Sequence, residues 1–365
     1  MLICLNMLSA LALLRHVRRT GEFSHARVCG LPEPDSSPQK RWTGRLFPQE
    51  LLGLPGPPSP SNKVYVAVPS QELRPRAAFI DTTIYSSGLP FGSFLRVGEN
   101  FVIPCPELLF VELTRVMRPA AVELLGHELC GSFSRDPSDP RCGTITHGLE
   151  AVTSVDDIRS FIGKCHRVLG TQPALHALNY VHDNAWSSME SVCALLMALP
   201  VSEGGYGLGR LHMNVRQEAP AELVRRGCKT SRVPDIVLED HPVGFNYDGK
   251  DHLNLDAIPG VAKEEGELRL LLAEIRDKYV DDRRRDRELA AQGRVIMPIV
   301  SEDLYQPNGL DAVVLEALMA SERLGGPPAA QVASSQLWSP ENARERQGLL
   351  LSLLPGTSRT SLGNY

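Results

Sequence analysis

The order of the secondary-structure patterns between residues 171 and 324 limits this chain to few folds. Apolar periodicity predicts two helices, three short strands, a long helix, a buried strand and a closing helix, at residues 172–185, 187–200, 208–217, 232–240, 242–249, 263–292, 294–300 and 310–324. Helices and strands in this order are typical of one α/β domain, in which helices flank a mixed sheet.

The N-terminal half has a different pattern. Strand-like segments precede helical periodicities, at residues 63–70, 77–87, 93–103, 105–117, 119–133 and 154–169, and Ser154 is suited to cap the last helix. A Pro/Gly-rich stretch at 31–62 predicts a loop. We therefore expect a smaller α+β domain over 1–170, a second domain over 171–325, and a linker, terminal helix and polar tail over 326–365.

Charge and the N-terminus restrict the functional class. The net charge is −5 and the pI is about 6.1, so any contact with nucleic acid requires a local basic patch. The apolar run at the N-terminus precedes its basic residues and is too short to span a bilayer. It predicts an amphipathic helix that packs on the protein body and ends near Gly21. We expect a cytoplasmic protein without a membrane segment.

The eight cysteines contain no CxxC pair, which favours reduced thiols in a cytosolic protein. Cys130, Cys142 and His147 could form a zinc cluster, but their spacing matches no zinc signature. Small buried residues beside a loop explain them better.

The residues most suited to chemistry lie at the second and third predicted strands. Asp235 begins one strand, and Asn246 and Asp248 share a face of the next because side chains alternate along a strand. Lys250 and His252 follow directly. Carboxylates on adjacent strands with a nearby cation can hold Mg²⁺ and a phosphate. Taken singly, each residue has a plainer explanation: a strand start, an Asp-Gly turn or a surface histidine.

This arrangement resembles the PD-(D/E)xK nuclease superfamily, and most closely the branch related to very-short-patch repair endonucleases. The resemblance implies a restriction-endonuclease-like fold, Mg²⁺ as cofactor and DNA as partner. It implies catalytic roles for Glu190, Asp235, Asp248, Lys250 and His252, metal ligation by Asp235, Asn246 and Asp248, and a helix motif of Asp282, Arg285 and Asp286.

Asn246 is the departure from the superfamily pattern, which has glutamate at that position. A neutral amide holds Mg²⁺ less tightly than a carboxylate, so we expect weakened DNA cleavage with the fold retained. The alternative is a catalytically inactive regulator that uses the nuclease fold to bind DNA or protein.

The N-terminal half is similar to domains of type IV abortive-infection antitoxins, in which a strand leads into a helix that begins with Pro-Glu, as at Pro106 and Glu107. This resemblance implies a phage-defence or toxin–antitoxin context and a cognate toxin as partner.

A basic loop precedes Asp235. It contains Arg225, Arg226, Lys229 and Arg232, which we expect to contact phosphates. The plainer alternative is an exposed loop in an acidic chain. The motif at 281–288 has a similar alternative, because charged helix faces are often covered by ion pairs.

Overall fold

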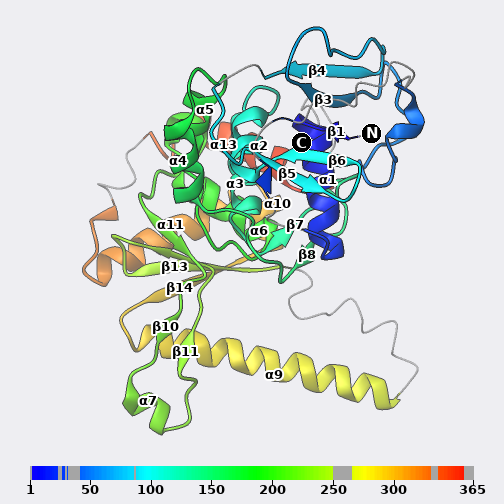
Figure 1. Cartoon of the computed structure of the whole chain (residues 1–365). Helices are drawn as coiled ribbons and strands as arrows, with labels where there is room; N and C mark the ends of the chain where they lie inside the picture. The colour runs from blue at the N-terminus through cyan, green and yellow to red at the C-terminus, as the bar shows by residue number, and fades with distance from the viewer. Residues whose placement is uncertain are drawn as a thin grey trace. The chain divides into compact units, whose positions relative to one another are not determined.

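The computed structural model divides the chain into two compact units, unit 1 (Met1–Ser188) and unit 2 (Met189–Thr357). Both combine helices with small sheets, which confirms the expected α+β class (Figure 1). The structure describes residues 2–23, 27–28, 31, 42–85, 88–249, 265–329 and 336–356.

Unit 1 contains one four-stranded sheet, in the order β1-β6-β5-β2, and two strand pairs, β3-β4 and β7-β8. The strand predicted at 93–103 is a hairpin of two strands, because Gly98 adopts a φ of 58° and turns the chain between them. The bounds are β1 Ile3–Cys4, β2 Arg27–Val28, β3 Val64–Val68, β4 Ile80–Ile84, β5 Phe94–Val97, β6 Phe101–Pro104, β7 Phe133–Ser134 and β8 Thr146–His147.

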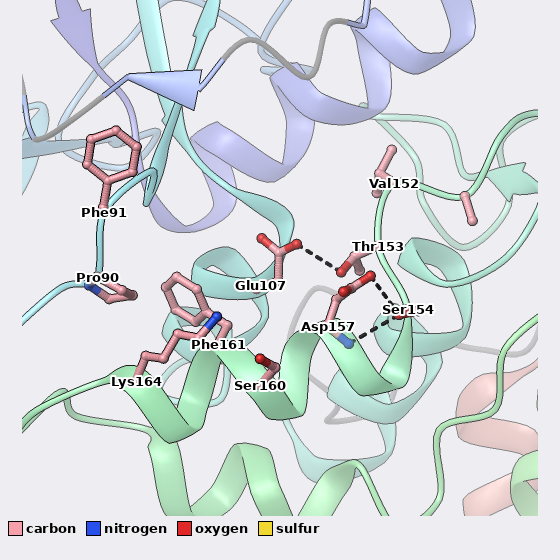
Figure 2. A pocket seen from close by; sticks show the side chains of 11 residues that line it. Pro90, Phe91, Glu107, Val152, Thr153, Ser154, Asp157, Ser160, Phe161 and Lys164 are labelled. Carbon is pink, nitrogen blue, oxygen red and sulfur yellow. Dashed lines mark hydrogen bonds between the residues drawn. The ribbon is translucent and has the colours of Figure 1, made fainter.

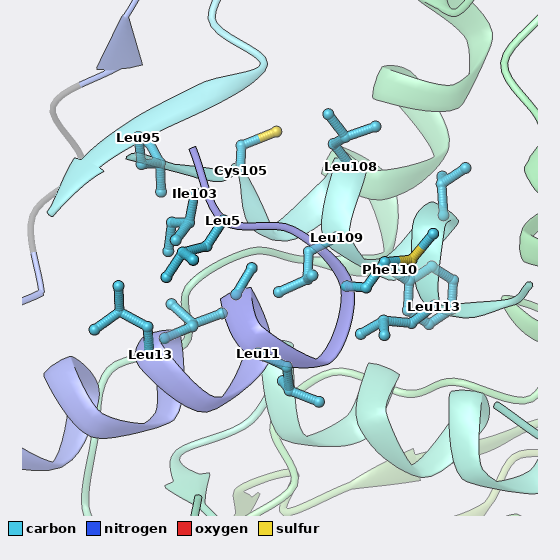
Figure 3. Close-up of a cluster of buried hydrophobic side chains, with 14 of the residues drawn as sticks. Leu5, Leu11, Leu13, Leu95, Ile103, Cys105, Leu108, Leu109, Phe110 and Leu113 are labelled. Carbon is cyan, nitrogen blue, oxygen red and sulfur yellow. The ribbon is translucent and has the colours of Figure 1, made fainter. Parts of the chain in front are cut away.

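The helices of unit 1 pack around a core in which α2 is buried along its whole length (Figure 3). Pro106 occupies the first turn of α2, where a missing N–H costs little. Ser154 caps α4 as expected, because its hydroxyl accepts the N–H of Asp157 at 3.1 Å. The bounds are α1 Met7–Thr20, η1 Gly44–Leu46, α2 Pro106–Leu113, α3 Pro119–Leu129, α4 Val155–Lys164 and α5 Thr171–Ala177.

Helix α1 ends at Gly21 as predicted, but it is not an amphipathic surface helix. Arg15 and Arg18 in its second half are buried, at 4% exposure each. Arg15 forms a bidentate ion pair with Glu128 at 2.9 and 2.6 Å, and Arg18 donates to backbone carbonyl groups. These internal partners allow a helix with basic residues to lie inside the core. Among the helices that the structure describes, none has the length and apolar character that a membrane crossing requires.

Unit 2 has the predicted order of elements. The described elements are α6 Ser188–Ala198, η2 Val201–Glu203, β9 Leu211–Met213, β10 Gln217–Glu218, α7 Ala221–Arg225, β11 Ser231–Arg232, β12 Ile236–Leu238, β13 Val243–Asp248, α9 Glu265–Ala290, β14 Val295–Val300, α10 Ser301–Tyr305, α11 Gly309–Arg323 and α13 Pro340–Leu353. The sequence therefore predicts the type of each principal element correctly.

The main sheet of unit 2 has the order β14-β13-β12-β9. Strand β12 is antiparallel to both β9 and β13, whereas β13 and β14 are parallel, so the sheet is mixed. The chain passes from β13 to β14 through α9, which parallel strands require because a tight turn cannot join them. A separate pair, β10-β11, lies outside this sheet.

The unit boundary differs from the expected one after residue 170. Helix α5 packs against α2, α3 and α4, so it belongs to unit 1. It also ends at Ala177 rather than 185, because the following backbone bonds to the end of α3, with the N–H of Asn184 donating to the carbonyl of Cys130 at 3.0 Å. The predicted terminal helix, α13, is an integral part of unit 2 through the ion pair between Arg346 and Asp311 at 2.7 Å.

Candidate functional site

The candidate site of unit 2 is a row of polar residues across three strands. Strand β12 pairs with β9 and β13 in a register that sets Ile236 opposite Met213 and Phe245. One residue earlier, the same register sets Asp235 between Asn214 and Asn246. Directly opposed residues of antiparallel strands share a face, and Asp248 shares it by alternation along β13.

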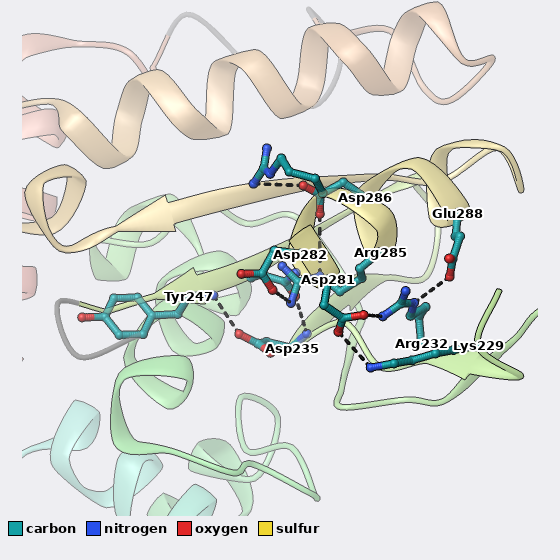
Figure 4. A network of polar contacts seen from close by, with 11 residues as sticks. Lys229, Arg232, Asp235, Tyr247, Asp281, Asp282, Arg285, Asp286 and Glu288 are labelled. Atoms are coloured by element: carbon teal, nitrogen blue, oxygen red, sulfur yellow. Dashed lines mark hydrogen bonds and ion pairs between the residues drawn. The ribbon is translucent and has the colours of Figure 1, made fainter. Parts of the chain in front are cut away.

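The backbone holds Asp235 firmly. Its N–H donates to Oδ1 of Asn246 at 2.9 Å, and its Oδ2 accepts the N–H of Tyr247 at 2.7 Å. Its carbonyl accepts the N–H of Asn214 at 2.9 Å. Both neighbouring strands therefore fix the position of this carboxyl group (Figure 4).

Helix α6 adds Glu190 to the row. The Nδ2 of Asn214 donates to Oε2 of Glu190 at 3.1 Å, which ties the helix to β9. Glu190 lies in the first turn of α6, where the helix dipole favours a negative charge. The sequence analysis identified Glu190 but missed Asn214, and only the strand register reveals that Asn214 lies opposite Asp235.

The row is short of positive charge. Burial, followed by repulsion from Glu190, raises the pKa of Asp235 to about 8, and Asp248 adds to this rise. The N–H of Tyr247 and the guanidinium of Arg285 oppose the rise without cancelling it. Burial raises the pKa of the Cys193 thiol, and the negative charges of Asp235 and Glu190 add to this rise. Partly buried carboxylates that repel one another favour a bound cation.

Asn246 is used differently from the metal ligand that the sequence analysis expected. Its side chain is 2% exposed, and its Oδ1 is already the acceptor for Asp235. Its Nδ2 is buried and makes no hydrogen bond within the described residues. The amide thus connects two strands and leaves one donor in the row.

The helix motif lies beside the row, as expected. Asp282 is 9% exposed and lies 3.4 Å from Nη1 of Arg285, and Nε of Arg285 lies 3.6 Å from Asp286 (Figure 4). Leu289, in the next turn, is buried under the sheet. Arg285 is the cation that α9 contributes to the field at Asp235.

The exposed cations of the basic loop have acidic partners, and their contact with phosphates stays a prediction. Arg225 and Arg226 are exposed but both pair with Glu222, at 2.7 and 2.8 Å. Lys229 pairs with Asp281 at 2.8 Å.

Arg232 does not face solvent. Its side chain is 5% exposed and pairs with Glu288 at 2.6 Å and with Asp281 at 2.9 Å. Its burial against two acids of α9 makes it a structural link between β11 and that helix, which corrects its expected role as a phosphate contact. The sequence analysis did not single out Asp281 or Glu288 as its partners.

Two candidate residues, Lys250 and His252, lie outside the described residues. Within the described ranges, no three His, Cys, Asp or Glu side chains are grouped closely enough to enclose a metal ion. The Cys130 cluster also differs from a zinc site: Cys130 is buried, Cys142 is exposed, and His147 Nδ1 contacts the carbonyl of Trp186 at 3.0 Å.

Unit 1 contains a pocket of about 530 Å³ between the loop before β5, helix α2 and helix α4 (Figure 2). Its buried wall includes Glu107, whose Oε1 accepts the hydroxyl of Thr153 at 3.0 Å. Phe91, which is 81% exposed, and Lys164 line its outer part.

Comparison of the chain with protein-family models, curated proteins and solved structures finds no match.

Proposed function

We propose that unit 2 is a restriction-endonuclease-like domain that binds DNA and cleaves it weakly with Mg²⁺. The order of helix, three strands, helix and strand supports this proposal, as does the mixed sheet β14-β13-β12-β9. The observation that carries it is the row itself: burial and then repulsion from Glu190 and Asp248 raise the pKa of Asp235 to about 8, beside the buried amide of Asn246.

The donor set fits Mg²⁺. All three acids offer hard oxygen atoms, and Mg²⁺ usually takes one or two carboxylates while it keeps several water molecules. An open set of carboxylates is therefore sufficient, and a closed cage is not needed. When bound, Mg²⁺ would polarise a phosphodiester and lower the pKa of a water molecule.

The protein residues divide the remaining tasks between them. Asp235 and Asp248 would hold the ion, and Asn246 would keep Asp235 in place by accepting its backbone N–H. Glu190, oriented by Asn214, would accept the proton that the attacking water releases. In the reaction, the water oxygen bonds to phosphorus, the ester P–O bond breaks, and the leaving oxygen takes a proton. The products are a phosphomonoester and an alcohol.

The geometry of Asn246 favours a second candidate function, a catalytically inactive antitoxin-like regulator. Because its Oδ1 accepts from Asp235, the side chain offers the ion no charge and little free coordination capacity. A domain of this kind would bind DNA or a toxin protein without hydrolysis.

Nicking of supercoiled plasmid in Mg²⁺ or Mn²⁺, with calorimetric metal titration, separates these functions. The wild type should bind Mg²⁺ and nick slowly, and Asp235→Asn should lose both. Asp240→Asn, which changes an exposed acid of the same unit, is the matched control and should behave as the wild type. Metal binding without nicking would favour the regulator, and absence of metal binding in the wild type would reject the nuclease proposal.

A further inference from the structure

Among its charged residues, helix α9 contains two series with a seven-residue spacing. Glu267, Glu274, Asp281 and Glu288 follow one another at intervals of seven residues. Arg269, Arg276 and Arg283 do the same, and Arg287 follows four residues later. Seven residues complete about two turns, so each series forms a stripe. The offset of two residues between the series puts the stripes about 200° apart.

The acidic stripe is used inside unit 2. Asp281 and Glu288 both form ion pairs with the guanidinium of Arg232, and Asp281 also pairs with Lys229. These pairs compensate the charges of Lys229 and Arg232 and direct the acidic side of α9 towards β11.

The basic stripe, Arg269, Arg276, Arg283 and Arg287, faces away from the sheet. Arg287 stands two positions before the buried Leu289, which is about 200° around the helix. All four arginines are exposed. Arg283 pairs with Asp286 at 3.1 Å, whereas within the described residues no ion pair involves Arg276 or Arg287. The unit therefore has an outward row of cations.

The basic stripe lies on a long exposed rod. From Gly266 to Tyr279 no residue of α9 is buried, and Figure 1 shows this part of α9 (yellow) as a single long helix. The four arginines span about 27 Å at 1.5 Å per residue. Successive members seven residues apart are separated by about 10 Å along the axis of α9, and each strand of duplex DNA carries one phosphate for about every 3.4 Å of the DNA axis.

We propose that the basic stripe of α9 binds the phosphate backbone of duplex DNA without base specificity and without metal. A straight row of guanidinium groups matches a regular polyanion, and phosphate contacts of this kind give affinity rather than sequence preference. The surface lies on the opposite side of α9 from the acidic row, so it holds DNA independently of catalysis. It would give an acidic chain an affinity for DNA at a surface separate from the basic loop.

The test measures the affinity for a fluorescent 20-base-pair duplex in EDTA at 50 to 200 mM KCl. The stripe variant is Arg269→Gln, Arg276→Gln and Arg287→Gln. The control, Arg225→Gln, Arg323→Gln and Arg344→Gln, removes three exposed arginines of the same unit and the same net charge. Each phosphate contact contributes about 3.5-fold to the loss of affinity over this fourfold salt range. The loss of affinity between 50 and 200 mM KCl should therefore be about 40-fold smaller for the stripe variant, which lacks three contacts, than for the wild type.

The control should keep the wild-type salt dependence, and a triple Arg→Lys variant of the stripe should retain most of the binding because it keeps the charge. Equal weakening in the control, no binding by the wild type in EDTA, or preference for RNA would overturn the proposal. Asp235→Asn should bind the duplex as the wild type does in EDTA. Absence of plasmid nicking would therefore not contradict DNA binding by the basic stripe. Absence of DNA binding by the basic stripe would not contradict the nuclease proposal.

Discussion

Replacement of Asn246 by glutamate should make the stability of unit 2 depend on Mg²⁺. The substitution restores the residue that the superfamily resemblance implies, and it adds a charge at a position that is 2% exposed. Glutamate can still accept the N–H of Asp235, so the link between β12 and β13 is retained. The change therefore mainly tests the electrostatics of the row.

The magnitude follows from the charges around position 246. Two carboxylates about 6 Å apart repel by about 3 kcal/mol at an effective dielectric constant of 20. In EDTA, Asn246→Glu should therefore lower the free energy of unfolding by about 3 kcal/mol. An ion bound at one hundred times its Kd returns about 2.7 kcal/mol, so 10 mM Mg²⁺ should largely restore stability if the Kd is about 0.1 mM.

The assay is urea unfolding followed by circular dichroism at pH 9, where the carboxyl group of Asp235 is charged, in EDTA and in 10 mM MgCl₂. Gln306→Glu, which adds the same charge at an exposed position of unit 2, is the control and should shift stability by less than about 0.5 kcal/mol. If Asn246→Glu is as stable as the wild type in EDTA, or if Mg²⁺ stabilises both equally, the reasoning about the row is wrong.

Three further substitutions test other parts of the structure. Arg232→Gln leaves two acids of α9 without their buried cation, so urea titration should show a loss of about 3–5 kcal/mol. Arg346→Met breaks the buried pair with Asp311, and limited proteolysis should then release α13 faster than in the wild type. Glu112→Gln tests pH dependence in unit 1. Burial raises the pKa of Glu112 from 4.5 to about 7, although hydrogen bonds from Tyr85 and Met7 oppose this. The pKa of Glu112 is higher in the folded protein than in the unfolded chain. Its contribution to the free energy of unfolding is therefore complete below pH 4.5 and is lost by about pH 7, a change of about 3 kcal/mol. Unfolding measured from pH 4.5 to 8 should show a smaller decline in the variant, and an unchanged decline would contradict the assignment.

Local rules determine much of this protein from sequence. Gly21 ends α1 because it accepts a left-handed conformation at φ 75°, and Ser154 begins α4 because its hydroxyl caps the first turn. Alternation along β13 places Asn246 and Asp248 on one face. These features depend on a few adjacent residues, so the order of elements and the acids of the row can be predicted from the sequence.

Features that depend on distant residues were decided only by the tertiary structure. Asn214 joins the row because β9 pairs with β12 in one register. Arg232 is buried because α9, more than forty positions later, supplies Asp281 and Glu288. The amide of Asn246 points to a backbone N–H because β12 lies beside it. A sequence pattern specifies which residues can carry charge, whereas the partners that neutralise it are chosen by contacts between segments far apart in the chain.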